Sequence, residues 1–412
     1  MLSRTVVNGS FGPVAPLCPP GAGLLAGDVA TPRVSPTQNS EAMERRKPKQ
    51  GQHFLQSAEL RDFSMWEVAN LDNAQVLQTF ATYRWGSLDK VICPGCGAIS
   101  KPFFRVDRAQ LRCRHCDRHF SPLVNTVFAD RKIPLKKLLM ALVKFISSAK
   151  GVSALELSRI IDVQVKTATV LLGKLRECLL RQKDTETLSG LIEIDGGYFG
   201  GKPRKSCFRG KSKPGEIAAM VEARLRGEPV SKRKPKGRAA RRNWEKRKNR
   251  RVVMVYRAVC PEGGEGAYAT RTFIALSENS AVVDKITPEI VVPNSTIMTD
   301  ENAAYTHLSK DYDHHCVEHS LEFCTINGVN ENQAESFFSR MRRAEYGVFH
   351  GYRPKYLADY AQEFAWREDA RRQTEMQKLM NLLRRVFDAG MSRWWRGYWQ
   401  GHNRPGELLV RV

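Results

Sequence analysis

Three acidic residues, far apart in the sequence, have the type and the surroundings for chemistry: Asp195, Asp300 and Glu335. Each aspartate follows a stretch with strand character, LIEI before Asp195 and TIMT before Asp300. Glu335 lies in NENQAESFFSRMRR, where apolar residues recur at helical spacing. Carboxylates that converge raise one another's pKa, so they stay ionised together only around a cation. Two Mg²⁺ (or Mn²⁺) ions, about 3.5–4 Å apart, would let these carboxylates stay ionised and would support phosphoryl transfer on a phosphodiester substrate.

The residues around these acids supply two secondary candidates. Alternate side chains of a strand share a face, so Glu193 is expected beside Asp195 on an exposed side. The glycines after Asp195 are expected to end the strand and to let a backbone or a substrate come close. On a helix with 100° per residue, Asn332 and Arg342 fall within roughly 80° of Glu335. A lone acid of this kind is more often a turn residue or part of a solvated face, and the three together favour a site.

Two pairs of cysteines have the spacing of a zinc site. The segments CPGC and CRHC each separate two cysteines by two residues. Each pair can hold one side of a tetrahedral ion. One structural Zn²⁺ is therefore predicted to bind Cys93, Cys96, Cys113 and Cys116. The strand-like stretches FFRVD and QLRCR predict a zinc ribbon that needs the ion to fold. Its arginines could contact DNA, or the ribbon could be purely structural.

A helical module is predicted over residues 133–183. In PLKKLLMALVKFISS the apolar residues lie on one face of a helix, and a second helix is expected from Ser153. A turn near Asp162 would separate the second helix from a third. Two helices joined by a tight turn resemble a helix-turn-helix, which would place Lys166 and Thr167 against a major groove. The alternative is a plain helical hairpin that packs on its neighbours.

The charge of the chain indicates a polyanionic partner. Its 412 residues carry 66 Lys and Arg against 43 Asp and Glu, a formal net charge of +23. Such a balance usually indicates nucleic acid, although a basic soluble enzyme is the alternative. Residues 202–251 alone hold 20 Lys and Arg against 4 Asp and Glu. This basic insertion, with Lys246 and Arg247, is predicted to lie along phosphates.

The sequence shows no sign of a membrane partner. No segment approaches the roughly 18 consecutive apolar residues of a membrane span, and the N-terminus lacks the pattern of a signal peptide. Four of the ten cysteines fall in the metal pattern and the others are scattered, which favours a reducing compartment. We therefore expect a cytoplasmic protein; the family resemblance given below further implies a bacterial cell and association with its nucleoid.

The length of the chain and the apolar patterns along it predict a multidomain α/β protein. The N-terminal residues are rich in Pro, Gly, Ser and Thr and lack any periodicity, which predicts disorder. The expected segments are a disordered basic tail (1–52), a short helical segment (53–88), the zinc ribbon (89–122), the helical module (133–183), an α/β domain with the three acids (188–370) that contains the basic insertion (202–251), and a C-terminal helix with a basic aromatic tail (371–412).

Over about residues 53–370, the chain resembles the bacterial insertion-sequence DDE transposases with an N-terminal zinc ribbon, the ISXO-like group of the IS-fifteen-ninety-five family. The segments that carry the resemblance are HFLQSAE, the ribbon cysteines, EIDGGYFGGK, MTDENAAY, VEHS, NQAESFFSRMRRAEYGVFH and KYLADYAQEFAWR. The resemblance implies an RNase H-like mixed sheet, in which an acid on the first strand, an acid on the fourth strand and an acid on a later helix meet. It implies that Asp195, Asp300 and Glu335 are the catalytic, metal-binding triad.

The chain also departs from the family pattern at several positions. Arg342 stands where the family often carries lysine, and it is expected to contact DNA together with Arg343. Asn can replace the third acid in this family, so Asn332 stays a secondary candidate. Gly196 stands where many relatives have a second acid, and Asn330 where many have histidine. These departures affect the exact metal and DNA contacts.

The resemblance implies a transposase that cleaves double-stranded DNA at terminal inverted repeats and transfers the freed strand to target DNA. Holding two DNA ends together implies a homo-oligomer. Two alternatives remain open at this point. One is an RNase H-like nuclease that cleaves without joining, and the other is a non-catalytic zinc-ribbon regulator derived from a transposase.

Overall fold

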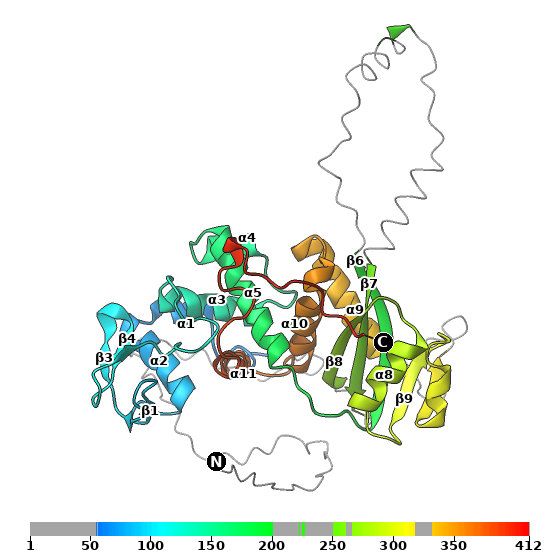
Figure 1. Ribbon diagram of the computed structural model, residues 1–412, viewed down its shortest axis with the longest axis horizontal. Coiled ribbons are helices and arrows are strands. Elements are labelled where there is room, and N and C mark those ends of the chain that lie inside the picture. The colour runs from blue at the N-terminus through cyan, green and yellow to red at the C-terminus, as the bar shows by residue number, and fades with distance from the viewer. Residues whose placement is uncertain are drawn as a thin grey trace, which may run out of the picture.

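A computed structural model describes residues 55, 57–200, 222, 225–226, 250–260, 266–317 and 332–411. A helical part with the ribbon lies at one end of the molecule and a five-stranded sheet at the other (Figure 1). The predicted tail and the insertion residues Lys246 and Arg247 lie outside the described residues. No helix in the described ranges is both long enough and apolar enough to cross a membrane.

The N-terminal part begins with two capped helices, α1 (Met65–Asn70) and α2 (Asn73–Trp85). Both begin with a capping box, in which Ser64 caps α1 and Asp72 caps α2. The ribbon strands follow. They are β1 (Val91–Ile92), which pairs with β2 (Ile99–Ser100), and the antiparallel sheet of β3 (Phe103–Arg105), β4 (Gln110–Arg112) and β5 (His119–Phe120).

Four helices complete this part of the molecule. They are α3 (Leu135–Ser147), α4 (Ala154–Ile160), α5 (Val165–Arg181) and, from the far end of the chain, α11 (Glu375–Asp388). The Ser153 side chain caps α4 by accepting the N–H of Glu156, and Asp162 adopts a φ of 49° in the turn before α5. The apolar face of α3 is buried, and α11 shares one hydrophobic core with α2, α3 and α5. The C-terminal helix therefore completes an N-terminal core.

The five-stranded sheet has the order β10-β9-β6-β7-β8. Its strands are β6 (Leu191–Gly200), β7 (Arg250–Val259), β8 (Ala267–Ala275), β9 (Thr296–Asp300) and β10 (Asp313–Val317). The pairs β6–β7 and β7–β8 are antiparallel, whereas β6–β9 and β9–β10 are parallel. With α8 (Ser280–Ile290) between β8 and β9, and α9 (Asn332–Ala344) after β10, this is the mixed sheet expected of an RNase H-like domain.

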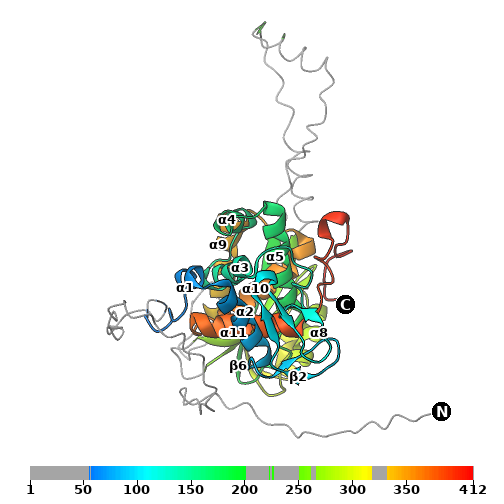
Figure 2. The same ribbon diagram turned by 90° about the vertical axis from the view of Figure 1, so that its left-hand side faces the viewer.

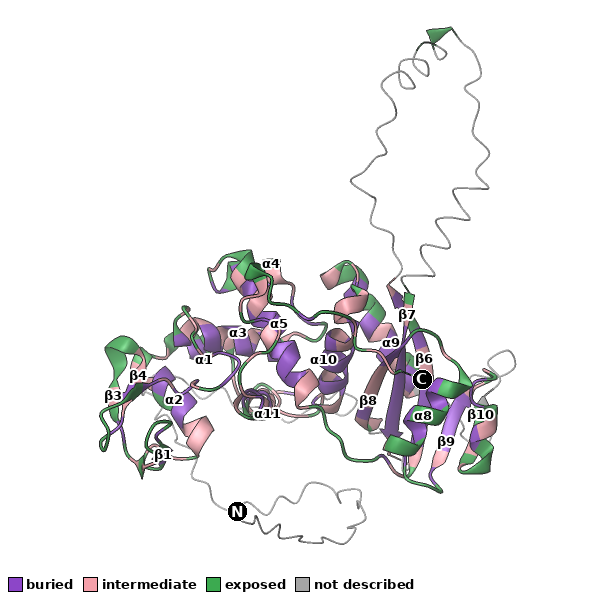
Figure 3. Ribbon diagram, viewed as in Figure 1, coloured by how far each residue is buried: buried purple, intermediate pink, exposed green. Residues whose placement is uncertain are grey.

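Helices cover both faces of this sheet. On one face, α8 packs against Ile192 and Ile194 of β6. On the other face, α9 and α10 (Leu357–Asp369) pack against Phe199 and Val253. Figure 3 shows that β7 and α10 are buried along most of their length. Five of the ten residues of β6 are buried as well. Short helical turns complete the fold: η2 (Val106–Arg108), η3 (Thr306–Lys310), η4 (Glu345–Phe349), η5 (Pro354–Tyr356) and η6 (Tyr398–Gln400).

Strand β6 differs from the sequence prediction in two ways. It does not end at Asp195, because it continues through the glycines to Gly200 and pairs with β7 throughout. Glu193, expected on an exposed side, is 1% exposed, because α9 covers that face. The prediction was wrong because alternation shows which side chains share a face, and not whether a helix covers it.

The C-terminal segment folds back onto its own chain. Trp395 packs over Gly173 of α5, where an added Cβ would lie 2.2 Å from the indole. The buried Arg404 donates from Nη2 to both carboxylate oxygens of Asp359 in α10, and Val410 donates a backbone hydrogen bond to β8. Figures 1 and 2 show this segment, in red, on the outside of the molecule. It therefore joins the helical part to the sheet.

Candidate active site and zinc site

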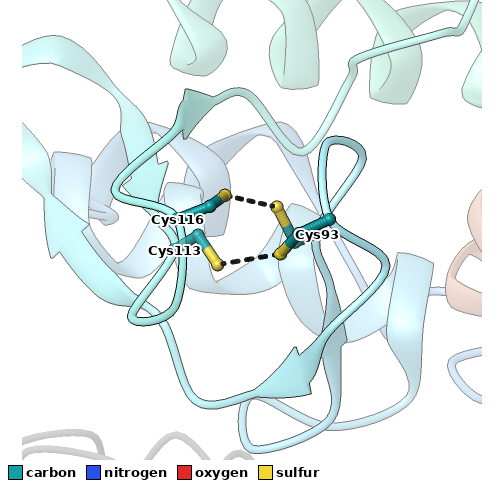
Figure 4. Close-up of side chains that lie close together, drawn as sticks. Cys93, Cys113 and Cys116 are labelled. Carbon is teal, nitrogen blue, oxygen red and sulfur yellow. Dashed lines mark hydrogen bonds between the residues drawn. The ribbon is translucent and has the colours of Figure 1, made fainter.

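The four ribbon cysteines converge on one point. Their sulfur atoms all lie within 4.8 Å of one another. Cys93 Sγ is 3.6 Å from Cys116 Sγ, and Cys96 Sγ is 3.7 Å from Cys113 Sγ. Figure 4 shows these side chains turned toward one another. A tetrahedral zinc ion with Zn–S bonds of about 2.3 Å holds its sulfurs about 3.8 Å apart. The cluster therefore fits one structural Zn²⁺.

The two cysteine pairs repeat one local geometry. In each pair, the backbone N–H two residues after the first cysteine donates to that cysteine's sulfur over 3.4 Å. The residue after the second cysteine has a positive φ, 72° at Gly97 and 56° at Asp117. Each cysteine pair is positioned by its own tight turn. The geometry within each half of the site therefore depends little on the rest of the fold.

Asp195 and Asp300 lie side by side on neighbouring strands. Strands β6 and β9 pair in parallel up to Glu193, which stands opposite Met298. Each aspartate comes two residues after that last pair, so both project to the same side at the point where the strands separate. This placement brings their carboxylates within 4.8 Å of each other.

A third carboxylate in this cluster is not among the sequence predictions. Glu278 lies between β8 and α8, and its carboxylate is within 4.8 Å of the ligand atoms of both Asp195 and Asp300. The Tyr305 hydroxyl donates to Glu278 Oε1 over 2.5 Å and so orients it. The surrounding sequence, ALSENS, lacks strand and helix periodicity, and it offers no signal that would single out this glutamate.

Two glycines of β6 make room for this arrangement. A Cβ at position 196 would lie 2.4 Å from Glu278 Cδ, which is closer than real contacts allow. A Cβ at position 197 would lie 2.5 Å from Phe338 Cδ1 of α9. Gly196 stands where many members of the resembled family carry an acid, and here a carboxylate from another element occupies that space. The glycines that suggested a broken strand instead permit close packing on both of its faces.

The carboxylates of the cluster are hard to ionise in the absence of a cation. Burial raises the pKa of Asp195 to about 6; the Gly196 N–H opposes this rise and the charge of Asp300 adds to it. Burial also raises the pKa of Glu278 to about 7, and both aspartates add to that rise. A divalent cation would offset this repulsion. A set of carboxylate oxygens suits Mg²⁺ or Mn²⁺, so the donor chemistry fits the predicted ions.

Glu335 lies near this cluster but outside the group of ligand atoms within 4.8 Å. It is an exposed residue in the first turn of α9. The other side of that helix is buried through Ala334, Phe337, Phe338 and Met341, as the periodicity predicts. Besides burial, the charges of Arg342 and Glu335 act on Asp195, since Arg342 lowers its pKa and Glu335 raises it. Both side chains therefore act on the same site. Asn332 begins α9, and its side chain lies outside the described atoms.

Glu193 is engaged by α9 and does not join the carboxylate cluster. Its Oε2 accepts the backbone N–H groups of Gln333 and Ala334, both over 2.9 Å. Burial raises the pKa of Glu193 to about 7, although these two donors lower it.

The predicted DNA contacts within the described residues lie on α5 and α9, where Lys166, Arg342 and Arg343 are exposed and Thr167 is half-buried. Lys166 and Thr167 are in the first turn of α5. The Trp399 indole donates to the Lys166 carbonyl over 3.2 Å, and the Lys166 ammonium lies 5.6 Å from the ring centroid of Trp399. Arg343 is exposed on α9. DNA contact by each of these residues stays a prediction.

Comparison with protein families places both sites in known domains. Residues 187–369, which contain the acidic cluster, match the ISXO2-like transposase domain. Residues 71–119, which contain all four ribbon cysteines, match the transposase zinc-ribbon domain. The comparisons with curated proteins and with solved structures found no match. Residues 187–369 thus belong to the ISXO2-like transposase domain family, and a transposase zinc-ribbon domain precedes them in the same chain.

Proposed function

We propose that this transposase-family chain cleaves DNA at the terminal inverted repeats of its insertion sequence and joins the freed ends to target DNA. The observation that carries the proposal is the meeting of Asp195 and Asp300 on adjacent strands, together with Glu278, inside a transposase domain. A net charge of +23 supports a DNA substrate.

The carboxylates have separate roles in this proposal. Asp195, Asp300 and Glu278 form the group that one ion would join, because their ligand atoms already lie within 4.8 Å of one another. Glu335 is the proposed ligand of a second ion, because it acts on Asp195 from the first turn of α9. Tyr305 holds Glu278 in place through its hydroxyl.

Two P–O exchanges make up the proposed reaction. When bound, two Mg²⁺ or Mn²⁺ ions supply activation of the attacking hydroxyl and stabilisation of the leaving oxygen. Water first attacks the phosphodiester at the end of the element, and the bond to the 3′ oxygen breaks, which leaves a 3′ hydroxyl. That hydroxyl then attacks a phosphodiester of the target, so one P–O bond forms for each that breaks. Arg342 is proposed to contact the phosphate, since its guanidinium acts on the same site as Asp195.

The N-terminal part is proposed to recognise the element's ends. The ribbon and helices α4 and α5, with Lys166 and Thr167, would contact the inverted repeats, while Lys246, Arg247 and Arg343 would contact phosphates. Joining requires that two ends be held together, so the active form is proposed to be a homo-oligomer on DNA.

Cleavage of a defined DNA tests the proposal directly. The purified chain is incubated with Mg²⁺ and a duplex that carries the element's flanking repeats. Asp195→Ala is the test variant, and Asp388→Ala, an exposed aspartate in the last turn of α11, is the matched control. The wild-type and control chains are expected to cut at the repeat ends, whereas Asp195→Ala leaves the DNA intact. Equal cleavage by Asp195→Ala and wild type would refute the role of Asp195.

A second assay separates transposition from the alternatives. DNA with pre-cut ends and a free 3′ hydroxyl is offered together with a target plasmid. A transposase yields joined product in Mg²⁺. A nuclease of the same fold yields none while it still cuts intact repeats, and a regulator binds the repeats without cutting or joining them.

A further inference from the structure

Glu193 is a buried carboxylate that the proposed chemistry does not use. It is 1% exposed and lies two residues before Asp195 on β6. Its Oε2 accepts the N–H groups of Gln333 and Ala334 in the first turn of α9, both over 2.9 Å. The first N–H groups of a helix have no acceptor within the helix itself. A side chain from the central strand of the sheet therefore caps α9.

Arg257 strengthens this attachment from the next strand. It stands directly opposite Glu193 in the β6–β7 pairing and is 2% exposed. Its Nη1 donates to the backbone carbonyl of Gln333 over 2.5 Å, and its Nη2 lies 3.3 Å from Glu368 of α10. Gln333 is therefore held at its N–H by β6 and at its carbonyl by β7.

The residues of this attachment are close in sequence to two acids of the proposed site. Glu335 is the residue after Ala334, and Asp195 is two residues along β6 from Glu193. Phe337 and Phe338 anchor the next turn of α9 in the apolar core. That packing holds the body of the helix, whereas the first turn, which carries Glu335, depends on its cap.

We propose that Glu193 is a positioning residue: by capping α9 from strand β6, it sets the place of Glu335 relative to Asp195. The inference rests on the proposed function of the acidic site. A negative charge at a helix N-terminus is also favoured by the helix dipole, which helps to retain a carboxylate at this buried position.

Three variants of the full-length chain test this role. Glu193→Gln keeps the shape and one acceptor oxygen, Glu193→Leu removes the acceptor, and Glu193→Asp keeps the charge but shortens its reach. Three quantities are measured: amide hydrogen exchange at residues 333 and 334, the Mn²⁺ affinity, and the Mg²⁺ concentration that gives half-maximal cleavage. In Glu193→Leu we expect amide exchange at residues 333 and 334 to be about tenfold faster and the Mg²⁺ requirement to be about tenfold higher. In Glu193→Gln we expect both quantities to lie close to the wild-type values, because one acceptor oxygen remains.

Glu177 offers a matched control for the loss of a buried carboxylate. It is 0% exposed in α5 and accepts the Ser392 hydroxyl and the Arg393 N–H, both over 2.6 Å. We expect Glu177→Leu to lower the melting temperature, but to leave the Mg²⁺ requirement and the exchange at residues 333 and 334 unchanged.

The outcomes distinguish this inference from the proposed function. A folded Glu193→Leu chain with the wild-type metal requirement, or an equal rise in Glu177→Leu, would overturn the positioning role. Where Glu193→Leu does not fold, Glu193→Asp is measured instead. A wild-type Mg²⁺ requirement in that variant would likewise overturn the positioning role. A wild-type chain without metal-dependent cleavage contradicts the proposed function instead, and the Mn²⁺ affinities of the variants then decide the role of Glu193.

Discussion

The zinc site and the acidic site are built in opposite ways. All four cysteines proposed to bind zinc lie within residues 93–116, and two repeated turns position them. The acids come from β6, from the connection between β8 and α8, and from β9, with Glu335 nearby on α9. The first site is local, whereas the second exists only after the sheet has formed. A structural site can close around its ion, but a catalytic site draws ligands from separate elements and keeps room for a substrate.

The two sites also differ in their effect on stability. Cys93 and Cys113 are buried in the core of the N-terminal part, so bound zinc adds to the stability of that core. The acidic cluster holds carboxylates whose burial raises their pKa, so without a cation it costs stability. The same kind of substitution should therefore have opposite effects on folding at the two sites.

The largest expected effect is the loss of zinc. Cys113→Ser should remove the ion and unfold the ribbon, because structural zinc contributes roughly 10–16 kcal/mol in small zinc domains. Zinc content and thermal unfolding measure this outcome. Cys178→Ser alters a cysteine that is equally buried in α5, and it should keep one zinc per chain. A Cys113→Ser chain with full zinc content would contradict the four-cysteine site.

Removal of either central acid should abolish chemistry without unfolding the chain. Asp195→Asn and Asp300→Asn should each slow DNA cleavage at least about a thousandfold, which corresponds to about 4 kcal/mol. Without metal, Asp195→Asn should be as stable as wild type or more stable, since it removes a buried charge. Cleavage rates and melting curves in a chelator measure both effects. A large loss of stability in Asp195→Asn would contradict the proposal that the two sites affect stability in opposite ways.

Glu278 and Glu335 can be ranked against each other. Glu278→Gln should lower the cleavage rate about a hundredfold, and Tyr305→Phe, which only frees Glu278 to move, about tenfold. Glu335→Gln is measured beside them at saturating Mg²⁺. Loss of cleavage in Glu335→Gln together with full activity in Glu278→Gln would show that Glu278 is a bystander.

The smallest expected effect comes from the glycine that admits Glu278. Gly196→Ala should displace that carboxylate and lower cleavage several-fold, with a stability cost of about 1–3 kcal/mol from overpacking. Gly347→Ala, whose added Cβ would meet nothing within 4 Å, is the matched control. Wild-type kinetics in Gly196→Ala would show that the place of Glu278 does not matter to the reaction.

Much of the fold follows from local patterns. The helix that starts after Ser153, the turn at Asp162 and the apolar face of α3 all lie where propensity and periodicity place them. The strands that carry Asp195 and Asp300 are also visible in the sequence, because an alternating or apolar run needs no distant partner to be recognised. The division of the whole chain into domains stays a prediction.

The features that the sequence did not predict share one cause, which is packing between elements distant in the sequence. Alternation in the sequence predicts an exposed face for Glu193, because no pattern in the adjacent residues indicates that α9 covers that face. No local pattern singles out Glu278, because its own segment lacks strand and helix periodicity. A C-terminal helix is predicted within residues 371–412, but the place of α11 in the N-terminal core depends on partners nearly two hundred residues or more away.

The amino-acid sequence by itself determined the two cysteine pairs that fit a zinc site, the sign of the net charge, and the strands that carry Asp195 and Asp300, since each can be recognised without knowing which distant residues meet. Only the tertiary structure decided which carboxylates meet and which helix they face. The physical reason is that burial and distance depend on how strands pair and on what packs over them, and those contacts join residues that no local pattern connects.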